Sequence, residues 1–133
     1  PENAFVANFI GENNRLMGTV ESIDGDKATV KTDSGDIVVA SKVNVNKAGE
    51  RATLSLRPER IIVSPSKGKT PNTYSAKVEE LIYHGDHIRT RFNVCGHDDF
   101  IVKIPNSIGN VSLKEGKVVN IGWMSEDCLA LDG

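Results

Sequence analysis

The chain is poor in the residues that mark secreted, membrane-spanning and nucleic-acid-binding proteins. Its 133 residues include only two cysteines, one Trp, two Tyr and four Phe, and its net charge is −2. Two cysteines cannot build a disulfide framework, and both lie in strand-like runs, which predicts reduced thiols in a core. A weakly acidic chain has no strong basic field to hold nucleic acid or anionic lipid. No apolar run approaches the length of a membrane span, and we expect no signal peptide.

The length and the start of the chain bound its organisation. A chain of 133 residues predicts one domain of ordinary size or two very small ones, with a core that needs no metal or disulfide. The chain begins with Pro1 rather than Met, which predicts a piece of a longer protein. Residues 1–10 carry apolar side chains at helical spacing and Gly11 suits a helix end, so we expect a short N-terminal helix.

The rest of the chain is typical of strands and turns. Apolar and polar residues alternate in short runs that Gly/Asp turns separate. The expected strands are 16–23, 27–32, 37–40, 51–57, 61–63, 75–83, 87–94, 100–104, 117–123 and 128–131, the last two forming a hairpin. About ten short antiparallel strands without intervening helices predict an all-β fold rather than a parallel α/β fold.

Residues 64–73 are the best candidate for a linker, because Pro, Gly, Ser and Thr dominate there and no apolar residue occurs. This linker divides the strands into two sets, 15–63 and 74–132, of about five strands each. Five strands are the count of an oligonucleotide/oligosaccharide-binding (OB) type barrel. The pattern predicts small OB-like barrels and leaves open whether there are two, or one built from both halves.

The run 54–63 is an extended segment interrupted by a proline between two charges. Pro58 cannot donate a hydrogen bond to a sheet ladder, so the strand must end, bend or lie at an edge there. Arg57 and Glu59 are thereby held at a defined corner. We expect this corner to serve an interaction between parts of a molecule.

No catalytic arrangement is evident. Residues 67–70 match the end of a phosphate-binding loop, but the Gly required five positions before Gly68 is Val63, and no helix pattern follows. Three histidines and both cysteines have spacings that zinc could use; they are His84, His87, His97, Cys95 and Cys128. A paired Cys-x-x-Cys is absent and turn histidines are commoner on surfaces. We therefore expect no catalytic residue, cofactor or metal.

Two further features have both a structural and a functional interpretation. Arg89, Arg91 and Lys103 share the outward parity of neighbouring strands and could form a basic stripe. The aromatic residues nearby fall on the core side, so binding of single-stranded nucleic acid is disfavoured. Trp123 ends an apolar strand and is either a core residue or an anchor between subunits.

Several short motifs follow one another in a recognisable order. They are Phe9–Asn14, Gly18–Val20, Leu56–Glu59, Tyr83–Asp86 and Trp123–Cys128. Together the motifs resemble the C-terminal regulatory region of ABC importer ATPases, the transport-associated OB (TOBE) domain. The resemblance covers nearly the whole chain, and among these ATPases the spermidine/putrescine (polyamine) importers are the most similar subgroup.

The resemblance implies a domain division and a function. Residues 1–11 would be the tail of the nucleotide-binding domain, and 12–133 a non-catalytic regulatory and dimerisation domain. ATP and Mg²⁺ would bind upstream. The implied partners are a second ATPase subunit and the membrane permease subunits, at the cytoplasmic face of the cell membrane. The candidate interface or regulatory residues are Arg57, Pro58, Glu59, His84, Gly85, Asp86 and Trp123.

Two other functions stay open. The chain could sense a small solute, in which case an oxyanion would favour Arg57, Arg89 or Arg91 and a polyamine would favour acidic clusters. Those clusters are Asp98-Asp99, Asp33/Asp36 and Glu126-Asp127. The third function is that of a single-stranded nucleic-acid-binding OB domain, which the charge and the aromatic content oppose.

Overall fold

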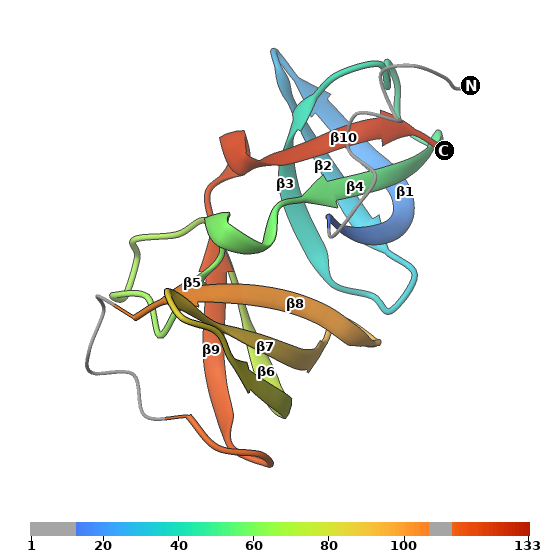
Figure 1. Cartoon of the computed structure of the whole chain (residues 1–133). Helices are drawn as coiled ribbons and strands as arrows, with labels where there is room; N and C mark the ends of the chain where they lie inside the picture. Colours follow the sequence, from blue (N-terminus) through green and yellow to red (C-terminus); the bar gives the residue numbers. More distant parts are fainter. Residues whose placement is uncertain (1–12, 107–112) are drawn as a thin grey trace.

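The computed structural model describes residues 13–106 and 113–133, and strands dominate them (Figure 1). The strands are β1 (Asn14–Asp24), β2 (Lys27–Thr32), β3 (Ile37–Lys42), β4 (Arg51–Leu56), β5 (Ile62–Val63), β6 (Asn72–Tyr83), β7 (His87–Val94), β8 (His97–Pro105), β9 (Val118–Trp123) and β10 (Cys128–Asp132). Two short 3₁₀ turns, η1 (Pro58–Arg60) and η2 (Ser125–Asp127), complete the order. The predicted all-β class is confirmed, whereas the predicted N-terminal helix lies outside the described residues.

One sheet closes into a barrel in the order β1-β2-β3-β10-β4. Its strands alternate as the sequence predicts: in β2, Ala28 and Val30 are buried and the residues between them are less so. The antiparallel β4–β10 pair and the parallel β3–β10 pair close the barrel. The second sheet has five strands in the order β5-β9-β6-β7-β8 and is open.

The strand sets of the sheets differ from the predicted sets 15–63 and 74–132. β10 leaves the second set to close the barrel, and β5 leaves the first set to pair with β9. The predicted hairpin of the last two strands is wrong, because η2 turns the chain away and β9 pairs with β5 and β6 instead. Residues 64–71 do not connect the sheets, because they join β5 to β6 within the open sheet, and β6 already begins at Asn72. The chain instead passes between the sheets at η1, from β4 to β5, and at η2, from β9 to β10.

The two halves of the chain repeat one fold. We call residues 14–63 the first half and 72–132 the second half. Val20 pairs with Val30 and Val78 pairs with Phe92, and each pair is followed by a shift of register in the β1 or β6 strand. Each strand of one half has an equivalent in the other half. The equivalent pairs are β1 and β6, β2 and β7, β3 and β8, β4 and β9, and β10 and β5. With these equivalences the circular order of the barrel becomes the order of the open sheet, interrupted between β8 and β5. The last strand of each half is therefore exchanged into the sheet of the other.

A reciprocal pair of asparagines joins the halves. The Asn14 amide of β1 donates to the Ile101 carbonyl at 2.7 Å and accepts the Ile101 N–H at 2.7 Å. The Asn72 amide of β6 donates to the Val39 carbonyl at 2.9 Å and accepts the Val39 N–H at 2.8 Å. Both asparagines are buried, and each mimics a strand by satisfying both backbone groups of one residue. We call these contacts the asparagine clamps.

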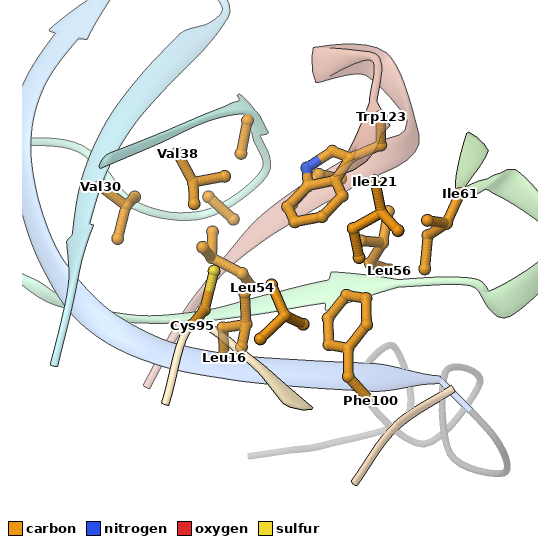
Figure 2. Packing of buried hydrophobic residues seen from close by; sticks show 14 of the residues in the cluster. Leu16, Val30, Val38, Leu54, Leu56, Ile61, Cys95, Phe100, Ile121 and Trp123 are labelled. Atoms are coloured by element: carbon orange, nitrogen blue, oxygen red, sulfur yellow. The ribbon is translucent and has the colours of Figure 1, made fainter. Parts of the chain in front are cut away.

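The core runs continuously through both sheets (Figure 2). Trp123 is fully buried, with ring centroids 5.7 Å from Phe100 and 5.1 Å from Tyr74. Such close aromatic pairs add to the stabilisation from area burial. Of the two interpretations of Trp123, the structure places it in the core of this chain.

Candidate functional site

The corner predicted around Pro58 is an exposed turn between the two sheets. β4 ends at Leu56, Arg57 is extended, and buried Pro58 opens η1, where its fixed φ suits the first helical position. A guanidinium nitrogen of Arg57 lies 3.9 Å from a carboxylate oxygen of Glu59, and both side chains are more than half exposed. An ion pair so exposed contributes little to stability. The pair is thus available for contacts beyond this chain.

The second half carries the equivalent turn, η2, beside η1. Arg60 of η1 lies 4.0 Å from Asp127 of η2, and the two residues occupy equivalent positions in the repeat. A groove of about 180 Å³ lies here, with basic side chains from η1 on one side and acidic side chains from η2 on the other. We call it the turn groove; its lining is Asn13, Ser55, Arg57, Arg60, Glu126, Asp127 and Leu129.

A second cleft, of about 290 Å³, lies beside the Asn14 clamp. It is lined by Asn13, Asn14, Arg15, Arg89, Asp99, Phe100 and Ile101. Arg15 and Arg89 come from different sheets, so the docking of the sheets creates this cleft. Two guanidinium groups in one cleft suit an anionic group, and Asp99 reduces that preference.

The third feature is the tip of the β6–β7 hairpin, where His84, Gly85 and Asp86 form the turn. The rings of His84 and His87 stack with centroids 4.7 Å apart. The His87 Nδ1–H donates to the Asp86 carboxylate at 2.8 Å. This hydrogen bond is the main cause that holds the pKa of Asp86 below its usual value. We call residues 83–88 the hairpin tip.

The structure brings only some of the predicted site residues together. Pro58 and Glu59 lie in η1 and Arg57 directly precedes it, and of the three only Arg57 lines the turn groove. The hairpin tip lines neither cleft. Trp123 is buried and lines neither cleft. Sequence reasoning did not find Asn14 or Arg15. The signal that could have found the clamps is an asparagine opening the first strand of each half.

The buried titratable groups do not form a reactive centre. Both cysteines are free and buried, as predicted for core thiols. The prediction that both lie in strands is wrong for Cys95, which occupies the turn between β7 and β8 with a positive φ. Burial raises the pKa of Cys95 and of Cys128 to about 12, so both remain protonated near neutral pH. In residues 13–106 and 113–133, no group of three or more His, Cys, Asp or Glu side chains is arranged to hold a metal ion. No helix within those ranges could cross a membrane.

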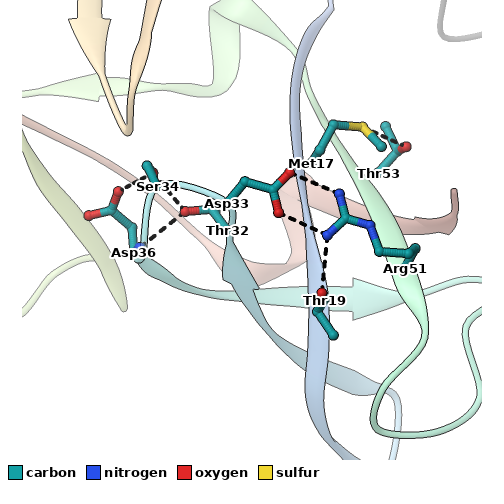
Figure 3. A network of polar contacts seen from close by, with 8 residues as sticks. All are labelled: Met17, Thr19, Thr32, Asp33, Ser34, Asp36, Arg51 and Thr53. Atoms are coloured by element: carbon teal, nitrogen blue, oxygen red, sulfur yellow. Dashed lines mark hydrogen bonds and ion pairs between the residues drawn. The ribbon is translucent and has the colours of Figure 1, made fainter.

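Several charges that sequence reasoning offered for ligands are engaged inside the chain. Asp33 receives two hydrogen bonds of 2.8 Å from Arg51 (Figure 3), which lower its pKa. Arg91, from the predicted basic stripe, lies 3.5 Å from Glu80 and donates to the Asp98 carbonyl at 2.7 Å. These pairs reduce the net charge available to a partner at both places.

Comparison with known proteins agrees with the geometry. A spermidine/putrescine import ATP-binding protein PotA of Rubrobacter xylanophilus is 30% identical over 135 residues, covering 100% of this chain and 35% of that protein. PotA of Trichodesmium erythraeum is 32% identical, covering 98% of this chain and 36% of that protein. PotA of Chromobacterium violaceum is 34% identical, covering 92% and 35%. The chain thus spans about a third of the length of these relatives.

A solved structure shares the fold over most of the chain. It is that of the cytoplasmic molybdate-binding protein ModG, in a form with molybdate bound, which superposes with a TM-score of 0.78 at 14% identity and covers 90% of this chain and 96% of that one. At that identity the likeness shows the fold alone. The family model of the TOBE domain matches residues 54–131, more than half of the chain. This chain belongs to the TOBE domain family.

Proposed function

We propose that this chain is the non-catalytic regulatory and dimerisation domain of an ABC importer ATPase subunit, of the polyamine type. The observation that carries the proposal is the similarity, over essentially the whole chain, to ATP-binding proteins of spermidine/putrescine import. The part of the protein upstream would bind ATP and Mg²⁺. The subunit would work with membrane permease subunits at the cytoplasmic face of the membrane.

The fold suits an assembly role. The asparagine clamps and the exchanged strands join the two halves, so a displacement of one half also displaces the other. η1 places Arg57 and Glu59 at an exposed corner of that body, fixed by buried Pro58. Such a pair would orient a neighbouring domain or subunit rather than stabilise this one.

The test uses the full-length ATPase assembled with its permease in proteoliposomes. Arg57→Ala and Glu59→Ala should lower spermidine uptake per ATP hydrolysed, or weaken subunit association, while the melting temperature is unchanged. Arg91→Ala is the matched control, because Arg91 also pairs with a partly exposed carboxylate but lies on the second sheet. Normal coupling and assembly in both η1 variants contradict the proposed role of the corner.

Two measurements on this chain alone separate the parts of the proposal. Light scattering at rising concentration should show a dimer, and a strict monomer contradicts a dimerisation role for this region. An ATPase assay should show no turnover, and measurable hydrolysis contradicts the non-catalytic assignment.

Solute binding is the second candidate function, and the cleft between Arg15 and Arg89 favours it. A polyamine is less favoured, because Asp33 is held by Arg51 and Asp127 faces Arg60. Calorimetry with molybdate, sulfate and spermidine distinguishes these ligands. Oxyanion heat that is lost in Arg15→Ala supports the cleft, and no heat with any of the three rejects the sensor role for this chain.

Nucleic-acid binding ranks last. The strand aromatics Phe92 and Phe100 are buried and offer no stacking platform. A filter-binding assay with a single-stranded oligonucleotide at low salt should show no salt-dependent retention.

A further inference from the structure

The hairpin tip is longer than the fold requires. In the first half Val20 pairs with Val30, and the equivalent pair in the second half is Val78 with Phe92, so the β6–β7 hairpin is four residues longer. The first half turns with Asp24 to Lys27 paired directly across a short polar turn. The shorter β1–β2 hairpin shows that this fold does not require the four extra residues of the β6–β7 hairpin. Both histidines of the hairpin tip lie in that extension.

Three hydrogen bonds to backbone carbonyls close the turn of this extension. The His84 N–H donates to the His87 carbonyl at 2.9 Å. Asn106, just after β8, donates from its side chain to the Gly85 carbonyl at 3.0 Å and from its backbone to the Asp86 carbonyl at 3.1 Å. These bonds keep the two imidazole rings on one turn, with centroids 4.7 Å apart.

The contact between Asp86 and His87 determines which ring nitrogen is available. A carboxylate only accepts hydrogen bonds, so His87 Nδ1 carries the proton in the neutral ring and Nε2 carries the lone pair. Histidines that bind metals commonly donate their other ring N–H to a carboxylate in this way, which fixes the tautomer and makes the ring a better ligand. His84 stacks beside the prepared ring.

We propose that the hairpin tip binds a divalent transition-metal ion through the imidazoles of His84 and His87, with Asp86 as the positioning residue. Imidazole ligands suit Zn²⁺, Ni²⁺ and Cu²⁺ rather than Ca²⁺ or Mg²⁺. Only two protein ligands come from the described residues, so water fills the remaining positions and the ion exchanges readily. The site goes beyond the proposed function and does not rest on it.

The test is a titration of the whole chain with Zn²⁺, followed by calorimetry and by NMR of the histidine rings. Saturable binding of one ion should shift the ring signals of His84 and His87 and leave those of His97 unchanged. His84→Gln or His87→Gln should weaken binding at least tenfold, and Asp86→Asn about tenfold because the tautomer is no longer fixed. His97→Gln, on β8, is the matched control and should bind as the wild type does.

Three outcomes overturn the proposal. They are the absence of saturable binding, full binding retained in the His84→Gln/His87→Gln double variant, and ring shifts centred on His97. The wild-type NMR map tests the site without any substitution, so a variant that folds poorly does not obscure the result. Asp86→Asn with unchanged affinity removes the positioning role and leaves the ligand assignment to the two histidine variants.

Discussion

The two halves of this chain have the same strand order, the same bulge position and equivalent clamps, yet they fill their interiors differently. Four equivalent core positions are aliphatic in the closed barrel and aromatic in or beside the open sheet. The pairs are Leu16 and Tyr74, Val30 and Phe92, Val38 and Phe100, and Leu56 and Trp123. A closed barrel of five strands has little interior, so small aliphatic side chains fill it. The open sheet lacks that closure, and large rings fill the space between it and the barrel.

The halves also differ at surface positions that do not determine the fold. At equivalent positions of η1 and η2 the chain has Arg60 and Asp127, which face each other. An exact repeat would place two like charges there, which repel. The two halves thus share the residues that hydrogen-bond to backbone groups, whereas the charge and the volume of other equivalent side chains differ. Function is best sought in the divergent parts, namely the turns η1 and η2, the Arg15–Arg89 cleft and the hairpin tip.

The largest expected loss of stability follows from removing an aromatic ring from the core. Trp123→Ala should lower the free energy of unfolding by about 4 kcal/mol, because it removes a fully buried ring and leaves a cavity. Leu56→Ala at the equivalent position should cost about 3 kcal/mol, since less volume is lost. Urea unfolding of both variants measures the difference. A smaller loss in Trp123→Ala than in Leu56→Ala contradicts the assignment of the aromatic cluster as the main filling between the sheets.

The next effect concerns the clamps. Asn14→Ala leaves both backbone groups of Ile101 without their partner and should cost about 3 kcal/mol. Hydrogen exchange should speed up at the Ile101 amide in this variant, and at the Val39 amide in Asn72→Ala. Asn13→Ala is the control, because among the contacts described the Asn13 side chain bonds only the hydroxyl of Ser55 and no backbone group. Equal protection of Ile101 in wild type and Asn14→Ala rejects the clamp.

A smaller loss of stability is expected when the residues at one pair of equivalent positions are interchanged. Gly18 of β1 corresponds to buried Ala76 of β6, and a methyl group at Gly18 would clash with backbone atoms of Lys31 and Thr32. Gly18→Ala should therefore cost about 2 kcal/mol. The reverse change, Ala76→Gly, should cost about 1 kcal/mol through backbone entropy and lost packing. Thermal unfolding of both variants checks the order, and a stabilised Gly18→Ala contradicts the close approach of β1 and β2.

The smallest expected effect is electrostatic and depends on pH. Arg51 lowers the pKa of Asp33 below its usual 3.8, so the pair stabilises the fold above that value and loses this contribution as the pH falls through the lowered pKa. The melting temperature of Asp33→Asn should lie slightly below that of wild type at neutral pH. The gap should close in acid, as the pH falls below 3.8 and through the lowered pKa of Asp33. A gap that widens on acidification contradicts the sign of the shift.

Much of the fold could be predicted from the sequence, because alternation and turn residues are local signals. The strands around Val30, Phe92 and Phe100 have the predicted inward parity. Pairing partners could not be predicted, because a period-2 pattern defines a face and not a neighbour. For that reason β9 and β10 were predicted as a hairpin and lie in different sheets.

The candidate site was predicted in part for the same reason. Pro58 has a fixed φ and no N–H, so the corner it makes with Arg57 and Glu59 follows from three adjacent residues. The Arg15–Arg89 cleft joins residues that are distant in the sequence and exists only because the two sheets dock. The repeat itself was also missed, since its halves share backbone geometry far more than residue identity.

The sequence by itself determined the all-β class, the inward-facing residues and the exposed corner at Pro58, since each depends on neighbours within a few positions. The tertiary structure alone decided the exchange of β5 and β10, the clamps of Asn14 and Asn72 and the meeting of η1 with η2. Those features depend on contacts between residues that lie dozens of positions apart. The packing of the shared core selects these contacts over other possible strand pairings, and no local sequence pattern encodes that packing.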